Sequence, residues 1–460
     1  MRPAPDVVPT VGEILVTVRP IPARAGKLLP KQVSELLEVA RGRTDGSGVQ
    51  ALPILSPDAL VALSPFGVVG LLSWSVWFVR RWLSQRARPV ANDHTATTSV
   101  IVPVYQEDPD VLAECLGTWL ANRPDELIIV VDVGDRACRE MLAGLDLPAW
   151  ARVVPFAHTG KRSALAVGIR AATGDLVVLS DSDTAWTPDL LREIQMPFVD
   201  PGVGGVGTRQ SVAVPGTSIW RRLAAWILNL RYLDYVPALG ARGSVPCLSG
   251  RTAAYRRAAL LPVLDELEHE VFLGRECVAG DDGRLTWLVL STGWRTVHQG
   301  SAHVVSLFPG TARGFFQQRL RWGRNSYRCY LTAAWKGWLW RQPLLTQVTV
   351  LQILLTPLTM GIAVAYVARA VAAHSLAFAA AYLGWVLVGR ALRGVSHLRR
   401  HPRDLALLPL LTLVTVVLAV PVKLGALATM NRQGWLTRTA DHVAPLGQSS
   451  ASLHGHAVLS

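Results

Sequence analysis

Acidic residues are missing from a long part of this chain: no Asp or Glu occurs from residue 283 to residue 403. Lysine is scarce as well, since only five of the 46 basic residues are lysines. The formal net charge is +13, and basic residues cluster beside apolar segments, at residues 80–88 and 390–403. This is the positive-inside pattern of membrane proteins. A nucleic-acid-binding protein needs a basic face with stacked aromatic side chains, so we expect no nucleic-acid partner.

Cysteine is also sparse, and its spacing favours neither a disulfide framework nor a metal cluster. The chain contains five cysteines, an odd number without metal-ligand spacing. All of them fall in a region that we expect to be cytosolic, where they would stay reduced. We therefore predict small, buried, unpaired side chains at Cys115, Cys138, Cys247, Cys277 and Cys329. Residues 1–58 lack the apolar run of a signal peptide, and we assign them no fold.

Four apolar segments approach the length of about 20 residues that a membrane helix needs. They lie at residues 59–79, 344–368, 371–389 and 405–430. We predict a multi-pass protein of the cell (cytoplasmic) membrane, with one transmembrane helix at residues 59–80, about three within residues 343–430, and a tail at residues 431–460. These segments contain no acidic residue that could serve a proton or cation path, which disfavours a transporter.

The region between the first and second apolar segments, residues 97–342, alternates strands and helices. Strands are expected at residues 99–104, 127–131 and 175–180, and helices at residues 109–122 and 163–172. The strands are continuous Val, Ile and Leu runs, which indicates a parallel sheet that helices cover on both faces. The sequence thus predicts an α/β, Rossmann-type cytosolic domain with a mostly parallel sheet, inserted between transmembrane and interfacial helices.

Aspartates follow two of the expected strands, at the edge where open sheets bind ligands. Asp132 comes directly after one strand, and Asp181 and Asp183 follow another. Two carboxylates on one side of an extended tripeptide can hold Mg²⁺ or Mn²⁺, which also neutralises a diphosphate. The alternative is a solvated turn, because Asp is a common turn former.

Two further motifs lie at expected helix starts. Lys161, within Gly160-Lys161-Arg162, combines a cation with a helix N-terminus and suits a diphosphate. Asp282, within Gly280-Asp281-Asp282, precedes a helix expected at residues 284–291 and could accept a hydroxyl proton. For both motifs the alternative is a solvated helix start in which capping and the helix dipole explain the charge.

Gln318, Arg321 and Trp322 share one face of a helix at their spacing. An indole can stack on a sugar ring while a guanidinium pairs with phosphate. The alternative is an interfacial Trp/Arg pair of a membrane-surface helix. We expect two such surface helices, without a catalytic role, at residues 219–236 and 330–340.

Together these motifs resemble the processive family 2 glycosyltransferases, which are the hyaluronan, chitin and cellulose synthases and their relatives. The resemblance extends over about residues 97–438. Finer matches lie nearest the hyaluronan/chitin synthase side, and they include Pro103-Val104-Tyr105-Gln106-Glu107, Ser249-Gly250, Arg284-Leu285-Thr286 and Trp435-Leu436-Thr437-Arg438.

The resemblance implies a GT-A fold and a set of roles. It implies that Asp132, Tyr105, Glu107, Lys161 and Asp181 bind the nucleotide-sugar. Asp181 and Asp183 would hold Mg²⁺ or Mn²⁺, and Asp282 would be the catalytic base. Gln318, Arg321 and Trp322 would bind the acceptor and diphosphate.

The implied function is that of a membrane-embedded, inverting hexosyltransferase that elongates and extrudes a polysaccharide. Its partners would be a UDP-sugar donor, a polysaccharide acceptor and the lipid bilayer. The alternatives are a non-processive transferase that adds one sugar to a lipid carrier, and a nucleotide-binding transporter. The chain departs from the hyaluronan synthase pattern where Gly283 replaces Arg, Arg251 replaces Pro and Leu436 replaces Gly.

Overall fold

The computed structural model describes residues 68–157 and 160–432, all of which lie in one compact unit, Pro57–Ser460. Several predicted features therefore lie outside the described residues. They are the segment at residues 1–58, the first part of the span predicted at residues 59–80, the motif at residues 435–438 and the tail beyond residue 432.

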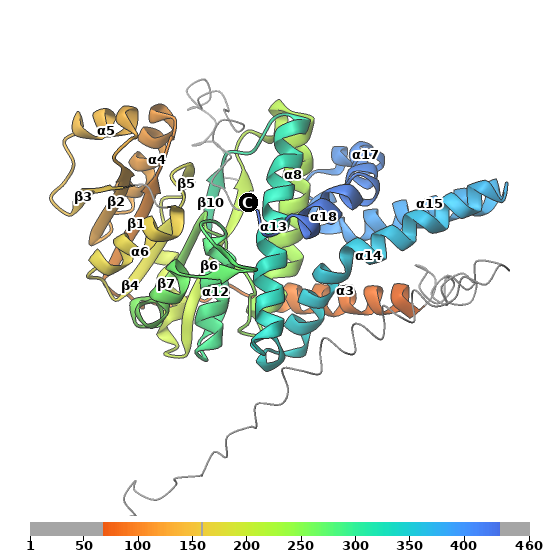
Figure 1. Cartoon of the computed structure of the whole chain (residues 1–460), viewed down its shortest axis with the longest axis horizontal. Helices are drawn as coiled ribbons and strands as arrows, with labels where there is room; N and C mark the ends of the chain where they lie inside the picture. Colours follow the sequence, from red (N-terminus) through yellow and green to blue (C-terminus); the bar gives the residue numbers. More distant parts are fainter. Residues whose placement is uncertain (1–67, 158–159, 433–460) are drawn as a thin grey trace, which may run out of the picture. The chain divides into compact units, whose positions relative to one another are not determined.

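Within the described residues, eight strands form one mixed sheet in the order β3-β2-β1-β4-β7-β6-β10-β5 (Figure 1). Neighbours run parallel at β3–β2, β2–β1, β1–β4 and β6–β10, and antiparallel at β4–β7, β7–β6 and β10–β5. The strands are β1 Thr98–Val104, β2 Glu126–Asp132, β3 Ala151–Phe156, β4 Leu176–Ser180, β5 Thr184–Trp186, β6 Val203–Val212, β7 Thr252–Arg256 and β10 Arg295–Ser306. A separate hairpin consists of β8 Val271–Phe272 and β9 Arg275–Glu276.

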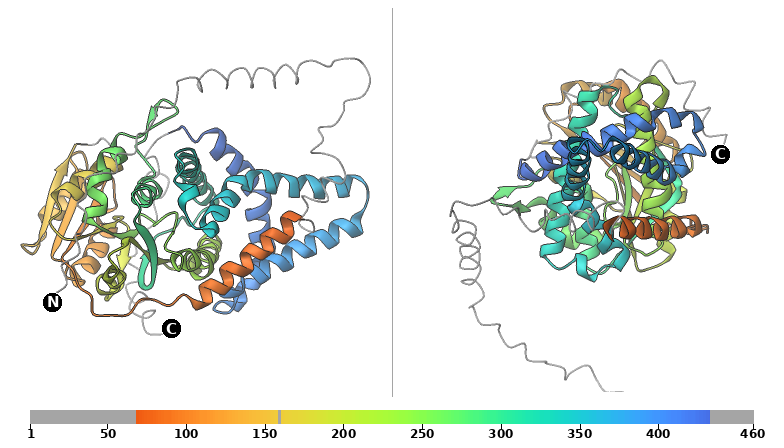
Figure 2. Two further views of the ribbon diagram at one scale, coloured as in Figure 1. Left: turned by 90° about the horizontal axis from the view of Figure 1, so that it is seen from below. Right: turned by 90° about the vertical axis from the view of Figure 1, so that its right-hand side faces the viewer.

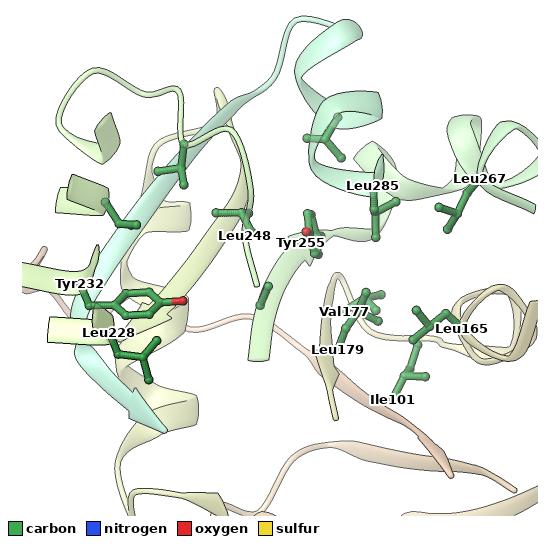
Figure 3. Packing of buried hydrophobic residues seen from close by; sticks show 14 of the residues in the cluster. Ile101, Leu165, Val177, Leu179, Leu228, Tyr232, Leu248, Tyr255, Leu267 and Leu285 are labelled. Atoms are coloured by element: carbon green, nitrogen blue, oxygen red, sulfur yellow. The ribbon is translucent and has the colours of Figure 1, made fainter. Parts of the chain in front are cut away.

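Helices cover both faces of this sheet. Those of the domain are α4 Pro109–Ala121, α5 Arg136–Ala143, α6 Lys161–Ala171, α7 Leu190–Gln195, α8 Ile219–Leu230, α9 Val236–Gly240, α10 Arg257–Leu260, α11 Leu264–Glu268, α12 Asp281–Ser291 and α13 Ala312–Trp335. Every residue of β1 is buried, and its side chains alternate between two cores. Val100 and Val102 pack with Trp119 of α4, whereas Ile101 packs with Leu165 of α6 on the opposite face (Figure 3).

The α/β prediction with a mostly parallel sheet is confirmed, and the expected strand bounds differ from those observed by about one residue. The antiparallel strand β7 between β4 and β6 was not anticipated. The helix expected at residues 284–291 begins three residues earlier, at Asp281. Both acids of the Gly280-Asp281-Asp282 motif therefore lie in the first turn of α12.

Long apolar helices follow the domain and are drawn in cyan and blue in the two views of Figure 2. They are α14 Leu344–Ala372, α15 Leu376–Arg393 and, after the short α16 Val395–Leu398, a broken helical segment that includes α17 Leu408–Thr412 and α18 Ala419–Ala428. Within the part of the chain that the structure describes, three segments are long and apolar enough to span a membrane: Leu344–Ile362, Leu376–Arg393 and Pro402–Ala428. These candidate spans agree with the three predicted after the domain. The earlier helix α3, Val68–Arg86, overlaps the predicted first span.

The two expected surface helices differ from the prediction. The first is interrupted, because α8 continues through a π-helical segment, Arg231–Tyr235, into α9. The second does not exist as a separate helix, since Tyr330 belongs to α13 and that helix ends at Trp335. Trp335 itself is 89% exposed, as expected of a surface position.

Candidate active site

A cavity of about 260 Å³ lies at the edge of the sheet where β1 and β4 end. These two strands are parallel neighbours, so the loops that follow them meet at the same edge. The first turn of α12 and the middle of α13 complete the walls. Of the residues predicted to form a site, Glu107, Lys161, Asp181, Asp183, Asp282, Gln318, Arg321 and Trp322 all line this cavity.

The acids that follow β4 are fixed by a tight turn. The Asp181 amide donates to the carbonyl of Arg251 at 3.1 Å, and the Thr184 amide donates back to the Asp181 carbonyl at 3.2 Å. Between the two acids, Ser182 Oγ donates to Glu107 Oε2 at 2.6 Å. This contact joins the loop after β1 to the loop after β4.

Lys161 connects the acids from two parts of the chain. Its Nζ lies 2.6 Å from Asp181 Oδ1 and 3.0 Å from Asp281 Oδ2. Burial acts to lower the pKa of this ammonium, but the charges of Asp181, Asp281 and Asp282 outweigh it and raise the pKa. Lys161 therefore stays charged, and its position compensates carboxylates that would otherwise repel one another.

Asp282 occupies the first turn of α12 because Gly280 turns the backbone there. Gly280 has a φ of +77°, which only glycine adopts without strain, and a Cβ at this position would lie 2.9 Å from Asn325 Cγ. Asp282 Oδ1 accepts from the Gly283 amide at 2.7 Å, and Oδ2 accepts from the Gly250 amide at 3.5 Å. Burial and the charge of Asp281 raise the pKa of Asp282, while Lys161 opposes the rise. A carboxylate with a raised pKa is a suitable proton acceptor.

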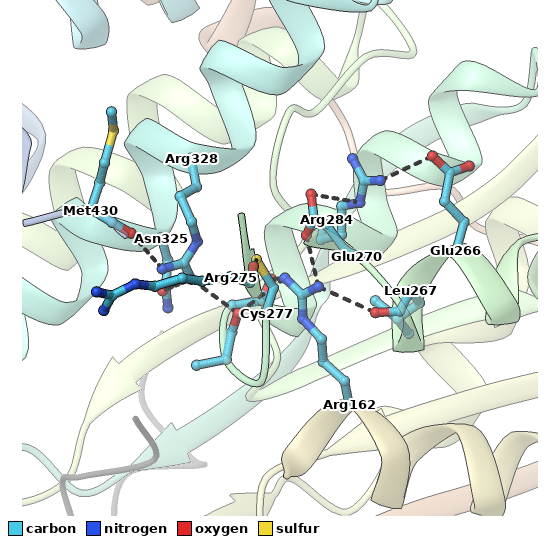
Figure 4. A network of polar contacts seen from close by, with 12 residues as sticks. Arg162, Glu266, Leu267, Glu270, Arg275, Cys277, Arg284, Asn325, Arg328 and Met430 are labelled. Carbon is cyan, nitrogen blue, oxygen red and sulfur yellow. Dashed lines mark hydrogen bonds and ion pairs between the residues drawn. The ribbon is translucent and has the colours of Figure 1, made fainter. Parts of the chain in front are cut away.

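A buried network of charged side chains contacts the backbone just before α12 and α12 itself (Figure 4). Arg162 donates to Glu270 Oε2 at 2.7 Å and also to the carbonyl oxygens of Ala279 and Gly280, at 3.0 and 3.2 Å. Glu270 Oε1 in turn lies 3.3 Å from Nε of Arg284 on α12. The start of α6, which carries Lys161, is thus tied to the loop that precedes Asp281 and Asp282 and, through Glu270, to α12 itself.

Helix α13 supplies an aromatic and cationic wall. Gln318, Arg321 and Trp322 face the cavity together, as their helical spacing predicts. The Trp322 ring meets that of Phe308 edge-on, with centroids 6.2 Å apart. The cavity therefore has acids and a lysine on one side and aromatic rings with arginines on the other.

Two predicted residues do not line the cavity. Asp132 is buried at the end of β2, where its Oδ1 accepts from the Gly134 amide at 2.7 Å. Tyr105 directly follows β1. Both lie at the carboxyl end of their strand, and β1 and β2 are parallel neighbours, so they share the sheet edge on which the cavity opens.

The residues present fit a divalent cation that a substrate helps to bind. Within residues 68–157 and 160–432, no group of three or more His, Cys, Asp or Glu side chains is arranged as a complete metal site. Asp181 Oδ1 is engaged by Lys161, while Asp183 Oδ1 accepts only a long hydrogen bond, 3.4 Å, from Thr184. Mg²⁺ is commonly held by one or two carboxylates together with substrate phosphates. Asp183, with Asp181, matches that pattern.

Several lining residues were missed from the sequence. Asp281 belongs to the Gly280-Asp281-Asp282 motif, but its ion pair with Lys161 could not be predicted, because the two residues are far apart in the sequence. Arg231 and Tyr232 belong to a segment that we expected to be a membrane-surface helix without a catalytic role, and Tyr330 to another. Four of the five cysteines are buried as predicted, and Cys247 is half-buried.

Comparisons with known proteins found a matching family, similar enzymes and a similar fold. The family described as "Glycosyltransferase like family 2" matches residues 95–325. An N-acetylglucosaminyltransferase of Rhizobium leguminosarum bv. viciae is 29% identical over 427 residues, which are 87% of this chain and 96% of that protein. An N-acetylglucosaminyltransferase of Sinorhizobium fredii is 30% identical over 367 residues, 76% of this chain and 86% of that protein.

Among solved structures, the fold is similar to that of a mannosyltransferase from Pyrobaculum calidifontis in complex with GDP-mannose and Mn²⁺. The TM-score is 0.56 and the sequence identity 22%, and the match covers 81% of this chain and 98% of that one. The likeness confirms the predicted GT-A type of α/β fold.

Proposed function

Because the chain belongs to glycosyltransferase family 2, we propose that it transfers a sugar from a UDP-sugar to a growing glycan, with inversion at the anomeric carbon. One observation carries the proposal: Asp282, Asp181 and Trp322, which are far apart in the chain, line the same cavity. A carboxylate with a raised pKa thus lies in the same cavity as an indole on which a sugar ring can stack.

The donor is proposed to bind across the loops that follow β1, β2 and β4. Asp132, Tyr105 and Glu107 would contact the nucleotide, and Lys161 would pair with the diphosphate from the N-terminus of α6. Asp183 and Asp181 would hold Mg²⁺ or Mn²⁺, which neutralises diphosphate charge when bound. Arg321 would reach the diphosphate from α13.

The acceptor sugar is proposed to lie on Trp322 with its reacting hydroxyl toward Asp282. Asp282 accepts the hydroxyl proton while the oxygen attacks the anomeric carbon from the face opposite the diphosphate. The new glycosidic bond forms as the bond to UDP breaks, which inverts the anomeric centre and releases UDP. The amide of Gly283, 2.7 Å from Asp282 Oδ1, holds the carboxylate in place for this step.

The candidate membrane helices support a membrane enzyme. We propose further that it works on the cytosolic side and passes its product through the bilayer. The Gln318, Arg321 and Trp322 wall favours a polysaccharide acceptor over addition of one sugar to a lipid carrier. Since the two rhizobial relatives are N-acetylglucosaminyltransferases, UDP-N-acetylglucosamine is the first donor to test.

The deciding experiment incubates the purified protein in lipid with a panel of radiolabelled UDP-sugars and Mg²⁺ or Mn²⁺. We expect release of UDP with one or a few donors, and label in products of many sugars. Label in a product extended by one sugar would establish the single-transfer alternative. Binding of UDP-sugar without UDP release under any condition would contradict an enzyme and support a transporter.

A further inference from the structure

Three arginines gather near the aromatic side of the cavity without acidic partners. They are Arg231 of the π-helical segment, Arg251 before β7 and Arg319 of α13. Within the described residues, none of the three forms an ion pair, and the Nε atom of each is buried without a hydrogen-bond partner. Lys161 is different, because two carboxylates already compensate it.

Arg231 and Arg251 both line the cavity, and Arg251 lies beside Trp322, the proposed stacking surface for the acceptor sugar. Strand β7 runs antiparallel to β4, so the residue before β7 lies beside the residue after β4, and its carbonyl accepts from the Asp181 amide. Its guanidinium carbon lies 4.2 Å from the Phe308 ring centroid and 5.4 Å from that of Trp322. The residue is only 9% exposed.

The positive charges are close enough to influence one another. Burial, together with the charges of Arg251 and Arg231, lowers the pKa of Arg319, whose guanidinium carbon lies 5.0 Å from the Trp322 ring centroid. The guanidinium groups of Arg251 and Arg319 thus both lie against the ring of Trp322. Buried like charges without counter-charges are costly, and an anion bound among them would relieve that cost.

We propose that Arg251 makes the acceptor end of the cavity an anion-binding subsite, so that the acceptor carries a carboxylate or phosphate group next to the sugar that stacks on Trp322. Guanidinium recognises both groups through paired hydrogen bonds. The identity of this end as the acceptor end rests on the proposed function. This anion is distinct from the diphosphate of the donor. Lys161 and Arg321 are proposed to bind that diphosphate, together with the metal held by the acids after β4.

The test measures binding, so that it does not depend on turnover. Three tetrasaccharides that differ only in the terminal sugar serve as probes: glucose, glucuronate and glucose 6-phosphate. Their affinities for the lipid-embedded protein are measured by calorimetry with UDP and Mn²⁺ present. We expect one or both anionic probes to bind about 10- to 100-fold more tightly than the neutral probe. The two anionic arms show which source, a uronate or a phosphate, fits the subsite.

Variants then assign the preference to the residue. Arg251→Gln should remove the preference, and Arg251→Lys should keep part of it because the charge remains. Arg256→Gln is the matched control, because Arg256 also lies over an aromatic ring, that of Phe198, but does not line the cavity. This variant should bind the anionic probes as selectively as the unmodified protein does.

Two results would overturn the subsite. One is equal binding of all three probes by the unmodified protein, which needs no variant to fold. The other is an Arg251→Gln protein that still binds the anionic probes more tightly than the neutral one. If that variant also loses affinity for UDP, Arg251 serves the donor instead of the acceptor. Failure of UDP release in the separate donor assay would instead count against the proposed function alone.

Discussion

Lys161 Nζ lies 2.6 Å from Asp181 Oδ1, so one of only five lysines pairs with the first acid after β4. The same nitrogen also contacts Asp281, and its charge lowers the pKa of Asp282. One ammonium therefore contacts acids from two distant segments of the chain. Its removal should change the proton affinity of the proposed base as well as the proposed contact with the donor.

Substitutions around Asp282 should move the acidic limb of the activity profile in opposite directions. As a base, Asp282 must be deprotonated, so activity falls as the pH drops through its pKa. Asp281→Asn removes a charge that raises this pKa, so the limb should move to lower pH. Lys161→Gln removes a charge that lowers it, so the limb should move to higher pH. The measurement is kcat/KM against pH with saturating metal.

A shift of both variants in the same direction would contradict this electrostatic role. Asp265→Asn is the control, because that side chain is 90% exposed and pairs with Arg170 away from the cavity. Its profile should coincide with that of the unmodified protein.

Replacement of the proposed base, Asp282, should affect the chemical step much more than donor binding. Asp282→Asn keeps the size and hydrogen-bonding capacity of the side chain but cannot accept the proton. We expect the rate of sugar transfer to fall by about 10²- to 10⁴-fold. The affinity for UDP, measured by calorimetry, should change little. Normal product formation by this variant would show that another group is the base.

Metal removal should stop transfer reversibly. We expect a chelator to abolish UDP release and added Mn²⁺ or Mg²⁺ to restore it, because Asp183 and Asp181, as proposed ligands, would supply only part of a coordination shell. Asp183→Asn should raise the metal concentration for half-maximal activity by about tenfold or more. Asp189→Asn, at a side chain that is 74% exposed, is the control. Full activity in chelator would contradict a metal requirement.

Local patterns were sufficient to predict the parallel half of the sheet and the acids at its edge. The apolar runs that became β1, β2 and β4 are buried on both faces, so their composition alone indicates strands, and parallel pairing brings the following acids to one edge. Helical spacing likewise predicted the common face of Gln318, Arg321 and Trp322.

Long-range pairing left no comparable signal. Strand β7 enters between β4 and β6 from a distant part of the chain, and only this pairing places Arg251 beside Asp181. The segment that contains Arg231 and Tyr232 has the composition of a membrane-surface helix, and its place at the cavity depends on tertiary packing, in which it contacts α3, α8 and α9. Asp132 was placed correctly at a strand end, yet it lies outside the cavity lining.

The final prediction concerns the buried charge network of Arg162, Glu270 and Arg284 (Figure 4). The side chains of Arg162 and Arg284 are each 3% exposed, and that of Glu270 between them is 8% exposed. Glu270→Gln would leave two buried guanidinium groups without this counter-charge. Breaking a buried ion pair on one side costs about 3–5 kcal/mol, so the variant should unfold at a clearly lower temperature in detergent.

Activity should fall as well, even below the unfolding temperature. Arg162 holds the carbonyls of Ala279 and Gly280, and its displacement would move the turn that sets the first residues of α12. Glu140→Gln is the control for loss of a carboxylate, since its pair with Arg136 is exposed and should contribute less than about 1 kcal/mol. Equal thermal stability of the Glu270 and Glu140 variants would mean that the buried network does not support the fold. A stable but inactive Glu270 variant would instead show that its main role is to position Lys161 and Asp282.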